Sequence, residues 1–440
     1  MQHTAQPDMD RLATAPAHLA ELERSAIRKA GWRLIPIVAL GYFLAYLDRT
    51  SVGFGALTML RQLQMSATEF GLGAGLMFAA YCLCEVPSNL GLYRYGARKW
   101  IARIMISWGL AAAATGLAIG PKSFYLTRIL LGIAEAGFFP GVIYYLTLWF
   151  PTPYRTRVLA WFTVSTPLSS FVGGPLSVSL LHLHGLLGLA GWQWMFIVEG
   201  LPACVLGIVT LYMLTDRPRD ATWLTAGERD ALERALAHDA KLHHAPTHAF
   251  LPALRDPRVY LLGLISFSFT MGSYGVAIWL PQILKGHGIS VTMTGWLSAI
   301  PYFFASVLML VWASHVDRTG KRILNLGLTC LLGALALIFS ILFDQLLPAL
   351  VGITFALIGT ITARTVFFTI PSRFLSGQAA AGGIALINCI GALGGFVGPY
   401  LVGYLKDKTG AFSAGMVGMA VVLFIATGLT VSLRAFMKDG

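Results

Sequence analysis

Charged residues are scarce in this sequence. Asp, Glu, Lys and Arg together make up only 12% of its 440 residues, whereas hydrophobic residues make up 56%. A soluble domain carries about 25% charged residues, so a fold this apolar could not cover a surface that faces water. The scarcity excludes an ordinary soluble protein and favours a chain that is surrounded by lipid, with a mean hydropathy of +0.69.

Cysteine is also rare, and its placement excludes a disulfide-rich scaffold. We interpret all five cysteines as small apolar packing residues, because each falls inside an apolar run: Cys82, Cys84, Cys204, Cys330 and Cys389. Four histidines lie in the run HDAKLHHAPTH at 238–248, but their spacing suits no standard ligand set. We expect no metal site and no cofactor.

Signatures of enzymes and of ATP-driven pumps are missing as well. The sequence has no Gly-rich phosphate loop, no nucleophile elbow and no cluster of metal ligands in a solvated segment. The long polar break at 215–258 is too short to hold a nucleotide-binding domain. We therefore expect neither an enzyme nor a primary pump.

What the sequence does contain is long apolar runs. A helix needs about 20 apolar residues to cross a bilayer, and backbone polar groups in lipid must be satisfied within each segment. These rules predict an all-α membrane protein with twelve transmembrane helices, at 34–58, 70–92, 100–120, 123–149, 157–181, 192–214, 259–283, 293–314, 323–343, 347–371, 379–404 and 411–434.

The positive charges are distributed unevenly between the two sides of the predicted membrane. With both termini on the cytoplasmic side, 24 of the 32 Lys and Arg residues lie inside, 5 lie outside and 3 lie within spans. This asymmetry follows the positive-inside rule. It predicts a multi-pass inner-membrane protein with cytoplasmic termini, and it argues that the net charge of +12 serves no nucleic-acid partner.

The chain reads as two repeats joined by the break at 215–258. RYGAR at 94–98 and GGPL at 173–176 recur as RTGKR at 318–322 and VGPY at 397–400, both at the same offset along the chain. Two separate motifs that share one offset indicate a duplicated unit. We expect a cytoplasmic arm (1–32), a six-helix half (33–214), a cytoplasmic linker loop (215–258), a second six-helix half (259–436) and a short tail (437–440).

Ionisable residues within the spans are conspicuous, because a charge at the bilayer centre costs about 2.5–3.5 kcal/mol. Span one carries Asp48 and Arg49, and span four carries Arg128 and Glu135, seven residues apart on one helix face. We expect the arginines to face a cavity and hold an anion while the carboxylates exchange protons. The alternative is that Asp48–Arg128 and Arg49–Glu135 are structural ion pairs. Glu199 in span six is expected to be structural.

These residues bring the sequence close to a known family. YLDRTSVGFG (46–55), EVPSNL (85–90), GARKWIARI (96–104), RILLGIAEAGFFPG (128–141), GWQWMFIVEGLP (191–202), FLSGQAAAGGIALIN (374–388) and GGFVGP (394–399) resemble the anion:cation symporter family of the major facilitator superfamily. The likeness covers nearly all of residues 33–436. It implies two pseudo-symmetric six-helix halves and uptake of organic anions such as tartrate, phthalate, hydroxyphenylacetate, hexonates and hexarates with protons.

The resemblance also implies roles for individual residues. Asp48 and Glu135 match proton-coupling carboxylates, and five further positions match substrate contacts: Tyr46, Arg49, Tyr81, Arg128 and Asn388. A gate on the cytoplasmic side would involve the loop residues Arg94, Arg98, Asp317, Arg318 and Arg322. Glu85 lies near the cytoplasmic end of span two, so its position predicts a gate or helix-packing carboxylate rather than a substrate ligand. Tyr93 stands where the superfamily pattern has an aspartate, which puts that part of the gate in doubt.

Two further departures concern the substrate. Phe368 stands where many relatives have tryptophan, and Ala392 where they have a second asparagine, while Arg364 is foreign to the pattern. With Arg364 and Phe368 as binding residues, the site loses hydrogen-bonding capacity and gains a cation.

This composition favours a compact dicarboxylate such as tartrate, or an aromatic carboxylate such as phthalate. The leading hypothesis is proton-coupled secondary uptake by a monomer through alternating access. The alternatives are an uncoupled facilitator, an anion exchanger, or a symporter of a sugar acid (hexonate or hexarate).

Overall fold

The computed structural model describes residues 7–242, 256–371 and 377–436. The tail at 437–440 and the histidines at 243, 244 and 248 lie outside the described residues. Within these ranges, twelve helical segments are long and apolar enough to cross a membrane. The predicted all-α fold with twelve spans is confirmed.

The helices follow one another without intervening strands in the described ranges. The first half consists of α1 (Pro7–Gln62), α2 (Ala67–Tyr95), α3 (Ala97–Ala114), α4 (Pro121–Glu135), α5 (Phe138–Thr147), α6 (Thr152–Thr163), α7 (Ser165–Leu181) and α8 (Gly191–Met213). The linker contributes α9 (Ala226–Leu242). The second half consists of α11 (Pro257–Gly286), α12 (Val291–Thr319), α13 (Arg322–Ser340), α14 (Leu346–Phe367), α15 (Gly377–Thr409) and α16 (Ser413–Phe436).

The two halves repeat each other in their helix ends. The offset between the sequence motifs also separates matching helix ends. It separates the start of α2 from the start of α12, and the end of α2 from the end of α12. It also separates the end of α1 at Gln62 from the end of α11 at Gly286. Ser66 and Ser290 cap α2 and α12, each accepting a hydrogen bond from the backbone amide three residues later. Both helices end at a glycine with positive φ, 88° at Gly96 and 68° at Gly320, a conformation that disfavours other residues. The predicted pseudo-symmetry is therefore present in the backbone.

Two predicted spans are broken rather than continuous. Span four divides into α4 and α5 at Gly137, whose φ of 85° is left-handed and whose α-carbon lies against Ser88. Span five divides into α6 and α7 at Val164. The first break ends α4 at Glu135, so this carboxylate lies at a helix terminus inside the bundle.

The linker was expected to be a solvated loop, but much of it is folded. Glu228 of α9 accepts hydrogen bonds from Ser25 at 2.7 Å and from Lys29 at 2.9 Å, both on α1. Burial alone would raise the pKa of Glu228, but these bonds and one from the Thr225 amide outweigh it and lower that pKa to about 2. Trp223 stacks on Trp149 at the same end of the first half. We call this the α9 end of the bundle and the opposite end the Gln62 end.

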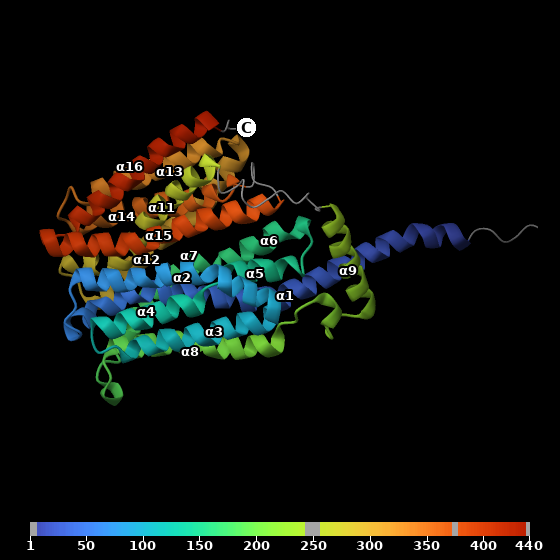
Figure 1. Ribbon diagram of the computed structural model, residues 1–440, viewed down its shortest axis with the longest axis horizontal. Helices are drawn as coiled ribbons and strands as arrows, with labels where there is room; N and C mark the ends of the chain where they lie inside the picture. Colours follow the sequence, from blue (N-terminus) through green and yellow to red (C-terminus); the bar gives the residue numbers. More distant parts are fainter. Residues whose placement is uncertain (1–6, 243–255, 372–376, 437–440) are drawn as a thin grey trace, which may run out of the picture.

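The halves lie side by side, with α9 beyond one end of the bundle (Figure 1). Toward the Gln62 end they touch through small residues. Gly71 of α2 lies against the backbone of Pro399 on α15, and Gly174 of α7 lies against Gly295 of α12. Gly71 and Gly295 are related by the repeat offset, so the two contacts are equivalent. The first contact lies where α2 packs on α15, and the second lies where α7 packs on α12.

The halves diverge toward the α9 end. On α2, the stripe that meets α15 runs from Gly71 through Gly75 and Phe78. Further along the same stripe, Val86 is 60% exposed and Tyr93 is 65% exposed. The bundle is thus closed at the Gln62 end and open at the α9 end.

A disulfide joins the halves near the middle of this stripe. Cys82 of α2 and Cys389 of α15 are paired, with their α-carbons 5.6 Å apart. The expectation that all five cysteines are small apolar packing residues is wrong for these two, which pair across the halves although they are 307 positions apart in sequence. Cys84, Cys204 and Cys330 are free.

Candidate functional site

A cavity of about 100 Å³ lies between the halves and is partly open to solvent. It is lined by aromatic residues and by polar side chains from both halves: Tyr42, Arg49, Phe78, Tyr81, Glu85, Phe139, Ser266, Phe269, Thr270, Tyr274, Arg364, Phe368, Asn388, Gly391 and Ala392. Such a mixture of apolar walls and few polar groups is typical of small-molecule sites.

Arg49 is the cation on the first half's side of the cavity. Its guanidinium makes an ion pair with Glu135, with Nη2 2.6 Å and Nε 2.8 Å from Oε1. The rings of Tyr46 and Tyr81 lie 5.4 and 5.2 Å from its central carbon, which adds cation–π attraction. Arg49 keeps 11% of its side chain exposed, whereas Glu135 is buried. The arginine therefore faces the cavity and the carboxylate sits behind it.

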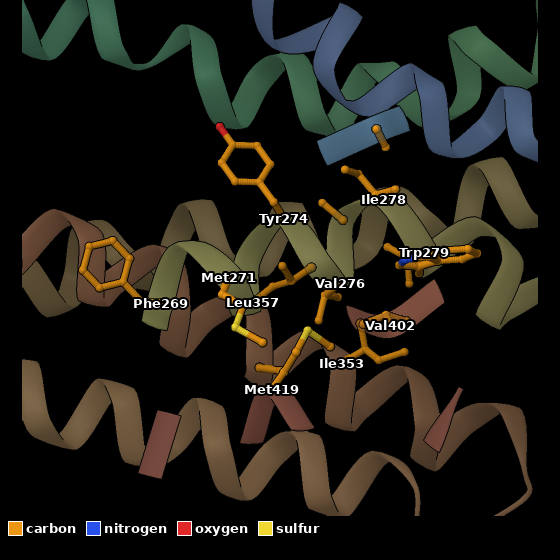
Figure 2. Close-up of a cluster of buried hydrophobic side chains, with 14 of the residues drawn as sticks. Phe269, Met271, Tyr274, Val276, Ile278, Trp279, Ile353, Leu357, Val402 and Met419 are labelled. Atoms are coloured by element: carbon orange, nitrogen blue, oxygen red, sulfur yellow. The ribbon is translucent and has the colours of Figure 1, made fainter. Parts of the chain in front are cut away.

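Arg364 supplies a second cation from the other half. Its Nη1 donates a 2.6 Å hydrogen bond to the hydroxyl of Tyr46 on α1. Tyr274 of α11 donates to the same hydroxyl at 3.4 Å and accepts a 3.3 Å bond from Arg49. Its ring leaves the apolar core of the second half and points its hydroxyl toward the first half (Figure 2). Two tyrosines thus connect two arginines across the interface.

The helical spacing of α1 explains which residues reach this site. Tyr42, Tyr46 and Arg49 recur at intervals of four and three and share one face. Asp48 is one residue earlier than Arg49 and points about 100° away. Its carboxylate accepts a 3.1 Å hydrogen bond from the Trp108 indole of α3 and is 4% exposed. Asp48 is therefore buried within the first half, away from the cavity.

Arg128 also lies behind the cavity wall. It is 1% exposed, and its Nη2 contacts the Met77 sulfur at 3.4 Å. Its Nε and Nη1 find no hydrogen-bond partner among the described residues. Asp48 and Glu135 are near enough for their charges to act on this guanidinium. The structure thus places Arg128 among the two carboxylates and outside the cavity lining, with donors free for a water or a rearranged neighbour.

The remaining expected binding residues lie in the lining. Tyr81, Phe368 and Asn388 all contribute to the cavity wall, and Phe368 is 44% exposed. Glu85, expected at a gate, lines the cavity too. Its position at the α9 side of Tyr81 places it at the open mouth.

The loop residues expected at a gate do not meet across the halves. Arg98 binds Asp216 of its own half, with its backbone amide 2.8 Å from Oδ1. Arg322 donates to the Thr369 carbonyl of its own half at 3.0 Å. Arg94, Asp317 and Arg318 are exposed. This arrangement is consistent with a bundle that is open at the α9 end.

Three polar residues of the site escaped the sequence reasoning. Ser266, Thr270 and Tyr274 lie on α11 and line the cavity. Their spacing of four residues puts them on one face of an otherwise apolar helix. The polar stripe could have indicated these residues, but the prediction used charged residues alone.

Two cations from opposite halves thus face one cavity that is open toward the α9 end. The comparisons give the family of this chain. The Major Facilitator Superfamily model matches residues 38–399, and the chain belongs to this superfamily. The protein is a multi-pass membrane transporter and not an enzyme.

Several relatives match nearly the whole chain. A protein of Agrobacterium vitis named for tartrate transport is 46% identical over 94% of this chain and 92% of its own length. The metabolite transport protein NicT of Pseudomonas putida is 42% identical over 92% and 94%. A quinolone resistance transporter of Acinetobacter baumannii is 41% identical over 95% and 97%.

Solved structures show the same fold at low sequence identity. A bacterial homologue of the human lysosomal transporter Spinster, in an inward-facing conformation, superimposes with a TM-score of 0.73 and 18% identity, covering 92% of this chain and 97% of that one. The inward-open xylose transporter XylE from E. coli gives 0.71 and 14%, covering 91% and 96%.

Proposed function

We propose that this protein takes up a small organic dianion together with protons across the bacterial inner membrane, with both termini in the cytoplasm. Tartrate is the first candidate, and an aromatic dicarboxylate such as phthalate is the second. The observation that carries the proposal is the pair of cations, Arg49 and Arg364, which face one cavity from opposite halves. The name of the Agrobacterium vitis relative supports the same substrate class.

The geometry favours a dianion because each carboxylate would meet a guanidinium on a different half. Planar guanidinium groups bind carboxylates through two parallel hydrogen bonds. In the described state Tyr46 occupies a donor of Arg364, whereas Glu135 and Tyr274 occupy the donors of Arg49. A bound dianion would replace the tyrosine hydroxyls and connect the halves through itself, which favours the closed intermediate that alternating access requires.

The proton-coupling part of the proposal assigns Asp48 and Glu135 as the groups that titrate. Glu135 shares its ion pair with the arginine that would bind substrate. When an anion binds Arg49, the attraction that holds Glu135 ionised weakens, and the carboxylate can take a proton. Anion binding and proton binding are then mutually favourable. An uncoupled facilitator or an exchanger would need no such link.

Uptake by the purified protein in liposomes tests the proposal. We expect labelled tartrate to accumulate when the exterior is more acidic than the lumen, and phthalate or galactonate to compete in proportion to how well each bridges two cations. Equal uptake with and without the pH gradient would support the facilitator alternative. Export of a quinolone in preference to tartrate uptake would refute the proposed function.

Arg364→Gln tests the dianion assignment. Because it removes the cation that only a second carboxylate needs, we expect dicarboxylate transport to fall by about tenfold or more, the size expected from one lost charged hydrogen bond of about 1.5–3 kcal/mol. Transport of a monocarboxylate should fall much less. An equal loss for both classes would show that Arg364 acts on the structure and not on the second carboxylate.

A further inference from the structure

Glu199 is a buried carboxyl group that the proposed coupling residues leave unexplained. It lies on α8, is 2% exposed, and accepts a 2.7 Å hydrogen bond from Ser177 of α7 on Oε1. Its Oε2 has no hydrogen bond within the described part of the chain. The described residues also give it no ion pair, in contrast to Glu135, which has Arg49.

A carboxylate in this position is unstable as an anion. Moving an ionised carboxylate into a low-dielectric interior without a cation is very costly, so such a group takes up a proton instead. A hydroxyl at Oε2 would then need an acceptor, and the Ser51 side chain of α1 faces this carboxyl group. Ser51 in turn bonds the main-chain carbonyl of Asp48 at 3.3 Å. Ser51 therefore lies between the Glu199 carboxyl group and the main chain of Asp48.

The carboxyl groups form a series in depth. Counting from the helix ends at the Gln62 end at 1.5 Å per residue, Glu199 lies about 12 Å in, Asp48 and Glu135 about 21 Å in, and Glu85 about 27 Å in. Two of the helix ends used for this count, those of α8 and α1, are neighbours, since Trp192 at the start of α8 donates a 2.7 Å bond to Gln62 at the end of α1. On the same count, Ser51 lies deeper than Glu199 and less deep than Asp48.

We propose that Glu199 is the proton-entry residue of this transporter, which receives a proton from the Gln62 end and passes it inward to Asp48, the next carboxyl group in depth. This inference rests on the proposed proton coupling and adds the step that precedes it. The proton leaves the Glu199 carboxyl and ends on the Asp48 carboxylate, so one group gains the negative charge that the other loses. From Asp48 the charge change acts on Arg128 and Glu135, which lie at the back of the cavity.

The helix that holds Ser177 provides the gate for this entry. Gly174 and Val178 flank Ser177 on α7, and both lie against Gly295 of α12 in the other half. In the described state this contact closes the Gln62 end, and Ser177 is fully buried. When the halves separate there, α12 leaves α7, and the Ser177–Glu199 pair loses its cover. Protons thus reach Glu199 only in the state that also admits substrate from that side.

The surroundings of Glu199 contain few other groups that could take this role. From α1, the titratable neighbour is Asp48, and from α3 the polar neighbour is the Trp108 indole, which bonds Asp48. From α7 the polar neighbour is Ser177. On α8 itself, Cys204 lies further along the helix and contacts α3. Arg128 and Glu135 of α4 lie beyond Asp48. Within the described residues, Glu199 is therefore the carboxyl group nearest the Gln62 end of this cluster.

The test compares proton-driven accumulation with counterflow, in which labelled tartrate exchanges against unlabelled tartrate without a pH gradient. Glu199→Gln keeps the acceptor for Ser177 but cannot release a proton. We expect it to lose most pH-driven accumulation, by about tenfold, while counterflow stays within about twofold of the wild type. Glu199→Asp retains a titratable group, and we expect it to recover part of the accumulation.

Matched controls separate this role from a structural one. Ser177→Ala removes the hydrogen bond but leaves the carboxyl group, and Glu233→Gln changes an exposed glutamate of α9. Both should accumulate tartrate. Accumulation by Glu199→Gln at the wild-type level overturns the proposal, and so does an equal loss of counterflow and accumulation in both Glu199 variants, which would indicate a packing role.

An infrared measurement keeps the inference testable even if tartrate is not the substrate. A protonated Glu199 gives a carboxyl band that Glu199→Gln lacks. We expect this band to shift in heavy water, because a proton-entry group must exchange with solvent. A band that never exchanges overturns the proposal. If the Glu199 band shifts in heavy water but the wild type shows no pH-driven transport of any acid, the proposed symport is refuted. Glu199 would then still be a group that exchanges protons with solvent.

Discussion

At the scale of single residues, the described part of the site combines one ion pair with one cation that has no ion-pair partner there. Arg49 is held by Glu135, whereas Arg364 meets a neutral tyrosine hydroxyl. A substrate carboxylate therefore competes with the Glu135 carboxylate for Arg49, but only with the Tyr46 hydroxyl for Arg364. We infer that a carboxylate at Arg49 releases Glu135 for protonation, whereas the second carboxylate of a dianion displaces only a tyrosine hydroxyl at Arg364.

The two carboxylates that we propose to titrate should separate binding from energy coupling. We expect Asp48→Asn and Glu135→Gln to abolish accumulation driven by a pH gradient while tartrate counterflow survives, because neither neutral side chain can carry a proton. Measurement of both activities in the same liposomes checks this. Wild-type accumulation in both variants would remove these residues from the coupling mechanism.

The geometry of Arg49 should matter as much as its charge. Arg49→Lys keeps the charge but cannot reproduce contacts from Nε and both terminal nitrogens to Glu135 and Tyr274. We expect the apparent affinity for tartrate to fall by about 10- to 100-fold, corresponding to one or two charged hydrogen bonds. Arg61→Lys, on the exposed last turn of α1, serves as the control. Normal affinity in Arg49→Lys would reduce this residue to a structural partner of Glu135.

Sequence reasoning could find most charged members of the site because charges are rare in apolar spans. Arg49 and Arg364 stand out for that reason, and both line the cavity. Sequence reasoning could not predict that Arg128 lies outside the cavity lining. Helical spacing shows on which face of α4 a residue lies, but not which neighbouring helix covers that face. Tyr274 escaped because a tyrosine in an apolar helix is a weak signal until its partners are known.

At the scale of helices, the pattern predicted the spans but not their breaks. The constant offset between the two sets of motifs reappears in the matching ends of α2 and α12. The division of span four depends on a left-handed Gly137 beside Ser88. That close contact is tertiary, and glycine alone does not reveal it. The helix α9 escaped for a similar reason, since its docking depends on Ser25 and Lys29 of a distant helix.

Glycine contacts between helices should control closure of the Gln62 end. A methyl group on Gly71 would meet the backbone of Pro399, which cannot move aside as a side chain could. We therefore expect Gly71→Ala to hinder closure at the α2–α15 contact and to shift the protein toward the state open at the Gln62 end. The yield of the Cys82–Cys389 disulfide, measured on a non-reducing gel, should fall.

Gly428→Ala is a matched control, because nothing lies within 4 Å of a methyl group added there. Gly295→Ala should reproduce the effect at the equivalent α7–α12 contact, where the added methyl would lie 2.9 Å from the Gly174 carbonyl oxygen. An unchanged disulfide yield in both interface variants would show that these contacts do not limit closure.

At the scale of the whole molecule, alternating access requires the two halves to separate and rejoin at each end in turn. The described state is closed at the Gln62 end, where Thr68 of α2 and Asp407 of α15 also bond at 2.5 Å. The disulfide between Cys82 and Cys389 lies within the same α2–α15 contact. A covalent link there holds the halves together at the end that alternating access must also open.

This placement predicts that transport depends on the thiol state of the protein. With the disulfide intact, we expect tartrate uptake in liposomes to be slow, and a reducing agent should raise it severalfold by freeing α2 from α15. Cys82→Ser and Cys389→Ser should transport at the reduced rate whether or not reductant is present. Cys330→Ser, a buried free cysteine of the second half, should behave like the wild type and respond to reductant.

If uptake by the wild type is equally fast before and after reduction, while a non-reducing gel shows that the disulfide was intact, separation of α2 from α15 near Cys82 is not part of the transport cycle. The opening at the Gln62 end would then have to pivot about this link, with α7 and α12 as the pair that moves apart.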